Sequence, residues 1–158
     1  MAKYDDASWH FAGDFPSDLP KENGGTHIGI FLAWCIHNKL LSEFQLEESS
    51  QDVSQVLSRQ ITGRDFLFSC CDGKLTDEDL NDLGNCFASD YYNDEGKFAQ
   101  TIASYFQDYS VMSDFYIKEF ELHDASIYHV ENTWDLYDVF STLIGDRFLK
   151  WKEFRKIE

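Results

Sequence analysis

The segment from Thr26 to Leu41 constrains the fold most, because most of its residues are apolar and they lie on all sides of a helix. Its longest apolar stretch, Ile28 to Ile36, has about half the length that a membrane-spanning helix needs. A short helix that is apolar on all sides is surrounded by other helices. We therefore predict a central core helix over 26–41 in a soluble cytoplasmic protein, with neither a signal peptide nor a membrane anchor.

The chain has 158 residues, of which 43% are hydrophobic and 16% aromatic. A chain of this length buries about 70% of its unfolded surface, so it needs no metal or disulfide to fold. It shows no internal repeat and no break in composition. We predict one domain over residues 1–158, a mainly α helical bundle.

The clearest further helix lies near the carboxyl end. Asn132 or Thr133 can cap it, and apolar residues follow at helical spacing: Leu136, Val139, Phe140, Leu143, Ile144, Phe148 and Trp151. Shorter helices are predicted over 53–60, 84–92 and 98–109. Two more are predicted from their capping pairs: one begins at Thr62 and Asp65 and runs to Cys71, and the other begins at Thr76 and Asp79.

Three segments are less regular. Residues 3–25 are rich in Asp, Gly and Pro and predict an ordered, turn-rich loop. Residues 42–52 form a polar connection. Residues 115–130 contain many β-favouring side chains, which are compatible either with helix and loop or with a small β-hairpin.

The chain is strongly acidic, and its charged residues are unevenly distributed along the sequence. The chain carries 29 acidic and 13 basic residues, and the stretch 65–146 holds 18 of the acids but only 3 of the bases. From Arg147 onward the balance reverses. An acidic surface repels nucleic acid and anionic membranes and favours a basic protein partner.

The predicted partner-binding residues lie in the acidic stretch. Tyr91 and Tyr92 are candidate aromatic anchors, with the core as the alternative place for both. The competing interpretation of the acids of 77–79, as charges in the first turn of a helix, is the better fit. The full set is Asp77, Glu78, Asp79, Asp82, Asp90, Tyr91, Tyr92, Asp94 and Glu95.

Chemical motifs are sparse. The sequence lacks an HExxH motif, a complete calcium-binding loop, a phosphate-binding loop and a CxxC pair, so we expect no cofactor and read the cysteines as reduced thiols. The alternative is a metal or acid–base site formed by His10, Asp14 and His27, because imidazole and carboxylate can bind a metal or transfer protons. The competing interpretation is structural: buried histidines that anchor the amino-terminal loop.

Three segments carry a family resemblance. The first is YDDASWHFAGDFPSDLPKENGGTHIGIFLAWCI, and the later ones are ITGRDFLFSCCDGKLTDEDLNDLGNCFASDYY and IYHVENTWDLYDVFSTLIGDRFLKW. They resemble an uncharacterised family of small acidic bacterial proteins with the signature SWHxxGDFPxDLPxExxxTHIGxFLxWxI. The resemblance implies a bacterial cytoplasmic protein and assigns no activity to any residue.

Size and charge are similar to those of immunity proteins, which neutralise toxins exchanged between bacteria. We therefore expect a non-enzymatic immunity-type protein that binds a cognate basic toxin. The alternatives are a small metal-assisted hydrolase that uses His10, Asp14 and His27, and a protein-interaction domain with an unrelated partner.

Overall fold

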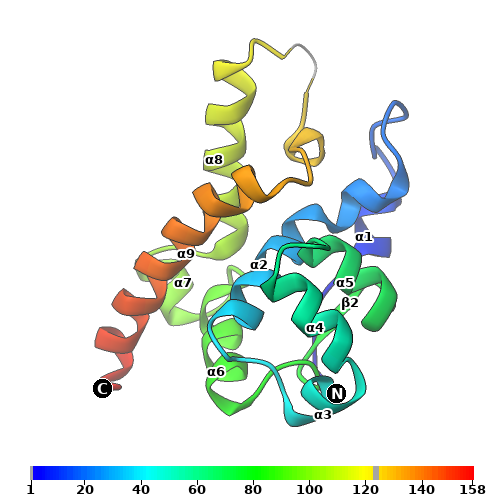
Figure 1. Cartoon of the computed structure of the whole chain (residues 1–158). Coiled ribbons are helices and arrows are strands. Elements are labelled where there is room, and N and C mark those ends of the chain that lie inside the picture. Colours follow the sequence, from blue (N-terminus) through cyan, green and yellow to red (C-terminus); the bar gives the residue numbers. More distant parts are fainter. Residues whose placement is uncertain (1, 123–124) are drawn as a thin grey trace.

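The computed structural model describes residues 2–122 and 125–158 and is mainly helical, as predicted (Figure 1). None of its helices is long and apolar enough to cross a membrane. In chain order the elements are β1 Lys3–Asp6, α1 Ala7–Phe11, η1 Lys21–Gly25, α2 Thr26–His37, α3 Glu43–Glu48, α4 Ser50–Leu57, α5 Gly63–Cys70, β2 Lys74–Thr76, α6 Asp82–Tyr91, α7 Lys97–Thr101, α8 Tyr105–Glu119, η2 Ile127–His129 and α9 Trp134–Arg155. The two η elements are short 3-10 helices.

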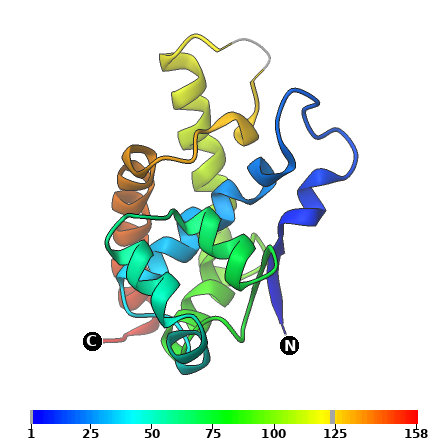
Figure 2. The same ribbon diagram turned by 45° about the vertical axis from the view of Figure 1, so that its right-hand side comes forward.

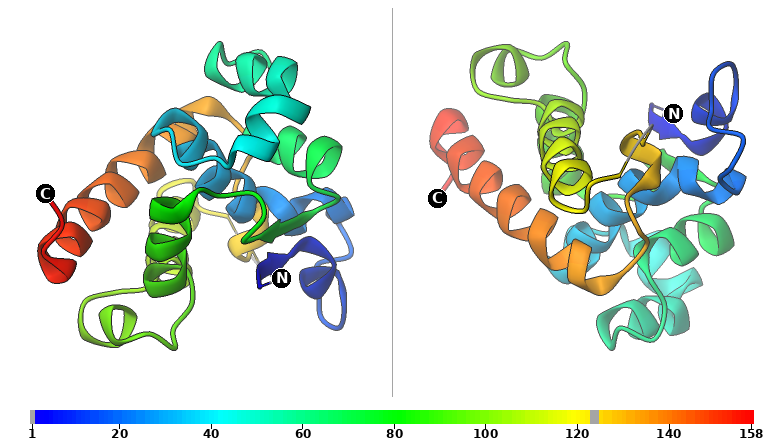
Figure 3. Two further views of the ribbon diagram at one scale, coloured as in Figure 1. Left: turned by 90° about the horizontal axis from the view of Figure 1, so that it is seen from below. Right: turned by 90° about the horizontal axis from the view of Figure 1, so that it is seen from above.

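The predicted core helix is α2, in which every residue from Thr26 to Ile36 is buried. Other helices surround it on several sides (Figure 3). Helix α5 crosses α2 so closely that a Cβ atom on Gly63 would lie 1.9 Å from the carbonyl oxygen of Gly29. Only glycine permits this approach of two backbones.

The amino-terminal segment is more regular than the predicted loop. Residues 3–6 form β1, which pairs antiparallel with β2. The Asp6 side chain then caps α1 by accepting a hydrogen bond from the Ser8 amide at 2.9 Å. Pairing with a strand some seventy residues away in sequence is a tertiary effect that local composition does not reveal.

The antiparallel strand pair of this fold is formed by β1 and β2, and not by residues 115–130, where the sequence allowed a hairpin. Helix α8 continues through Glu119, and residues 127–129 form η2. His123 and Asp124, which fall in the same range, lie outside the described residues. β-favouring side chains here take a helical backbone because tertiary packing overrides a weak local preference.

Helix boundaries depart from the prediction at several other places; for example, α2 ends at His37 rather than at residue 41, and α4 spans 50–57 rather than 53–60. The apolar spacing over 98–109 belongs to two helices, since α7 ends at Thr101 and Ser104 caps α8. The polar stretch 42–52 contains α3, capped by Ser42. The Thr62–Asp65 capping box of α5 is confirmed, whereas Thr76 and Asp79 bond to one another in a turn before α6.

Ion pairs hold α9 against the body. Arg155 binds both carboxylate oxygens of Asp90 at 2.6 and 2.9 Å, and Trp151 donates to the same carboxylate at 2.7 Å. Arg147 binds Asp108 in the same two-point manner at 2.8 and 3.0 Å. Two of the cations after residue 146 therefore neutralise acids within the molecule.

His37, the last residue of α2, packs on Trp134 and Tyr137 of α9 and faces Arg59 and Asp138. Burial, aided by the Arg59 charge, lowers the pKa of His37. The unfolded chain then takes up the proton more readily, so this contribution to stability is present above about pH 6.5 and is lost as pH falls. We expect the free energy of unfolding to fall less from about pH 7 to about pH 5 in His37→Gln than in the wild type. Urea denaturation at both pH values measures this free energy. An equal loss between about pH 7 and about pH 5 in the two proteins would contradict the prediction.

Candidate functional site

A buried polar cluster joins the amino-terminal segment to the helical body, and Asp5 of β1 is its centre. Its Oδ1 accepts hydrogen bonds from His10 Nε2 and from the Asp6 amide, both at 2.8 Å. Its Oδ2 accepts from His27 Nε2 at 2.9 Å and from the Tyr92 hydroxyl at 2.7 Å. Four donors on one carboxylate satisfy its capacity almost completely.

The two histidines occupy different depths. The His27 side chain is 1% exposed, and its carbonyl oxygen accepts from the Tyr105 hydroxyl. The His10 side chain is 13% exposed, and its Nδ1 lies 2.8 Å from the Tyr128 hydroxyl. A carboxylate can only accept, so both imidazoles carry a proton on Nε2; in the neutral tautomer of His10, Nδ1 then accepts from Tyr128. We call Asp5, His10, His27, Tyr92 and Tyr128 the Asp5 cluster.

The protonation states fit this pattern. Burial acts to raise the pKa of Asp5, but hydrogen bonds from His10 and His27 outweigh it and hold the pKa well below its usual value. Burial lowers the pKa of His27 and keeps it neutral. Burial and the Asp5 charge raise the pKa of Tyr128. The raised pKa keeps the Tyr128 hydroxyl protonated at neutral pH, so it can donate a hydrogen bond to His10 Nδ1.

The structure corrects one member of the predicted metal group. His10 and His27 come together, but Asp14 is exposed in a bend after α1, and Asp5 supplies the carboxylate instead. A local signal for Asp5 is present in the sequence Asp6-Ala-Ser, which is typical of a helix N-cap. The cap starts α1 and places Asp5 just before that start and His10 just after it. The structural interpretation of these histidines as anchors agrees with their hydrogen bonds.

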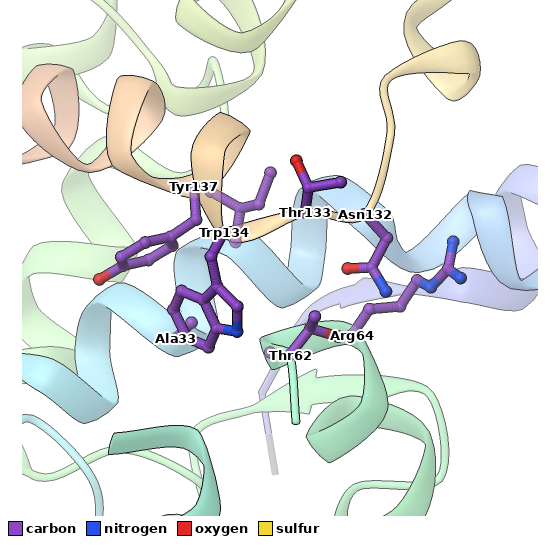
Figure 4. A pocket seen from close by; sticks show the side chains of 9 residues that line it. Ala33, Thr62, Arg64, Asn132, Thr133, Trp134 and Tyr137 are labelled. Atoms are coloured by element: carbon purple, nitrogen blue, oxygen red, sulfur yellow. The ribbon is translucent and has the colours of Figure 1, made fainter. Parts of the chain in front are cut away.

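A small pocket between α2, α5 and the start of α9 is too narrow for a substrate. Figure 4 shows Trp134 and Tyr137 of α9 beside Ala33 of α2, with Asn132 near Arg64 of α5. Its cavity volume is about 10 Å³, close to the minimum for one water molecule.

Several of the predicted partner-binding residues serve the interior. Tyr91 and Tyr92 are 0% and 1% exposed, and their hydroxyls donate to Asp108 and Asp5. This corrects their role as surface anchors: the spacing of Phe87, Ala88 and Tyr91 on α6 already marks its core face.

The acids of this set divide in the same way. Asp79 is buried and accepts from Gln45 Nε2 at 2.8 Å, and Asp90 is occupied by Arg155 and Trp151. Asp77 is partly buried. Glu78, Asp82, Asp94 and Glu95 are exposed, and their contact with a partner stays a prediction.

An apolar groove of about 280 Å³ lies between α8 and the first turns of α9. The carboxyl end of α8 extends beyond the other helices (Figures 1 and 2), which leaves this face of α8 uncovered. The side chains that line the groove are almost entirely apolar: Met112, Phe115, Tyr116, Glu119, Phe120, Leu136, Val139 and Phe140. We call it the α8–α9 groove.

Comparison with known proteins places the chain in a family. Residues 3–130 match the model of a family described as "Domain of unknown function (DUF7832)". The chain belongs to this family. No curated protein and no solved structure matches it.

The range matched by the DUF7832 model includes the whole Asp5 cluster, from Asp5 to Tyr128, and all of α8. It ends before α9 begins at Trp134. The cluster therefore lies entirely within the matched range, whereas one wall of the α8–α9 groove is built from residues beyond it.

Proposed function

We propose that this protein is an immunity-type inhibitor of the bacterial cytoplasm that binds a cognate basic toxin in its α8–α9 groove. The observation that carries the proposal is an exposed apolar groove in a strongly acidic surface. The acidity supports a cationic partner, and the apolar lining supports a protein rather than a free ion.

The lining residues expose unusually large apolar surfaces. Phe115 is 67% exposed, Phe120 62% and Val139 47%. Scattered apolar side chains are ordinary on a protein surface, but a contiguous apolar patch marks an interaction site. Phe115, Phe120 and Val139 border one groove, so a partner that fills it buries all three together.

The chain segments that form the groove carry mostly negative charges. Lys118 is the one basic residue among the charged side chains of 111–122 and 131–140; the acids there are Asp114, Glu119, Glu121, Glu131, Asp135 and Asp138. Of these, Asp138 is paired with Arg59. The complementary occupant is an amphipathic basic segment, whose apolar face enters the groove while its Lys and Arg side chains meet the acids.

Replacing Phe115 and Val139 together by serine is expected to weaken toxin binding by about 100-fold, because truncating two central interface residues costs roughly 1–2 kcal/mol for each. Both side chains are exposed, so folding should be preserved. Leu149→Ser is the matched control: this leucine is 61% exposed on α9 but does not line the groove. Calorimetric titration with the partner measures both variants.

The partner is obtained by affinity capture from the native cells and then expressed alone. We expect it to arrest growth, the wild-type protein to restore growth on co-expression, and the double variant to fail. Binding should weaken with added salt, since the steering charges are exposed. A partner that is harmless by itself would contradict the immunity role, and equal binding by the double variant and Leu149→Ser would remove the groove from the interface.

A further inference from the structure

We propose that Asp5, His10 and His27 form a binding site for one divalent metal ion of the zinc type. Each offers a ligand atom, and these atoms all lie within 4.8 Å of one another. The site is separate from the α8–α9 groove, and its existence does not depend on the proposed partner.

The ligand set indicates which ions fit. Two imidazole nitrogens and one carboxylate, without a thiolate, suit Zn²⁺, Fe²⁺, Co²⁺ or Ni²⁺, whereas Ca²⁺ and Mg²⁺ require mainly oxygen. Both imidazoles direct Nε2 at the same carboxylate, one at each oxygen. Three elements, β1, α1 and α2, thus converge on one point through their side chains.

Outer hydrogen bonds hold two of the three ligands, His10 and Asp5, as they do in metal centres. The Tyr128 hydroxyl contacts His10 Nδ1 at 2.8 Å, and the Tyr92 hydroxyl donates to Asp5 Oδ2 at 2.7 Å. Metal-bound histidines almost always bond through their second nitrogen, which fixes the ring. A hydroxyl both donates and accepts, so Tyr128 tolerates the shift of the His10 proton from Nε2 to Nδ1 that metal binding requires.

The ion would have to replace two hydrogen bonds. The nitrogen–oxygen distances of 2.8 and 2.9 Å are shorter than the roughly 3.3 Å between ligands of tetrahedral zinc, so the ligands must separate by a few tenths of an ångström. We expect this movement at His10, because it lies in the short α1 and is 13% exposed, whereas His27 is held in α2. The same exposure provides the route of entry.

The test is a titration of the chelator-treated full-length protein with Co²⁺, whose visible absorption reports the ligands, followed by displacement with Zn²⁺. We expect one equivalent to bind. His10→Ala should weaken binding by about 100-fold or more, and Tyr128→Phe, which keeps the ring but removes the outer hydrogen bond, by roughly 10-fold or more. Circular dichroism of each metal-free variant checks its fold.

His37→Gln is the control, since His37 lies at the other end of α2 and packs against Trp134 and Tyr137 rather than in the Asp5 cluster. Its affinity should equal that of the wild type. Three results would each overturn the proposal: no stoichiometric binding, unchanged affinity in both His10→Ala and Tyr128→Phe, or an intense thiolate charge-transfer band that assigns the bound ion to cysteine.

Discussion

Replacing Asp5 by alanine should destabilise the metal-free protein by about 3–5 kcal/mol. The substitution removes the acceptor of four hydrogen bonds. It leaves the buried donors of His27 and Tyr92 without their partner, and each unpaired buried group costs about 1–3 kcal/mol. Urea denaturation in the presence of a chelator measures the loss.

Asp14→Ala is the matched control for Asp5→Ala. Asp14 carries the same side chain in the same amino-terminal segment but is exposed. A surface substitution of this kind changes stability by less than about 0.5 kcal/mol. If the two variants unfolded at the same urea concentration, the Asp5 cluster would not be the anchor of the amino-terminal segment.

Gly63→Ala should cost about 3 kcal/mol or more, because a methyl group cannot fit between α2 and α5. The new Cβ would meet the carbonyl oxygen of Gly29 at 1.9 Å and its carbonyl carbon at 2.7 Å. These are backbone atoms of a buried helix and cannot turn aside as a side chain can, so the helices must separate. Thermal and urea unfolding both report the change.

Gly145→Ala, in the middle of α9, is the control, and we expect it not to lower the stability of the protein. Its nearest neighbour would be Trp34 Nε1 at 4.0 Å, an ordinary contact. Alanine favours the helix by up to about 1 kcal/mol over glycine, so this variant should be as stable as the wild type or more so. A Gly63→Ala protein that matched Gly145→Ala in stability would show that the crossing of α2 and α5 relaxes easily.

The helices predicted well are those whose signals are local. The apolar run of α2, the capping box of α5 and the stripe of α9 all depend on residues within a few turns of each other. By contrast, β1 exists because β2 pairs with it. The polar helix α3 is fixed in part by the bond from Gln45 to Asp79, far along the chain.

The candidate sites show the same division. The N-cap at Asp6 is a local signal that sets Asp5 near His10, but the pairing of β1 with β2, far along the chain, is what also carries Asp5 beside His27. The sequence predicts one wall of the α8–α9 groove, because Val139 belongs to the apolar stripe of the carboxyl-terminal helix. Which part of that stripe remains uncovered depends on how far α8 extends, and this is a property of the assembled fold.

The Asp5 cluster also sets an order of events during synthesis. Its hydrogen bond from Tyr92 to Asp5 spans 87 residues, and that between His10 and Tyr128 spans 118. Residues 3–11 leave the ribosome before Tyr92 and Tyr128, so the intervening chain must emerge before these contacts can form. Until then β1 and α1 lack their anchors and are exposed to proteases and chaperones. Strand β1 and helix α1 are therefore among the last elements of the fold to be held in place.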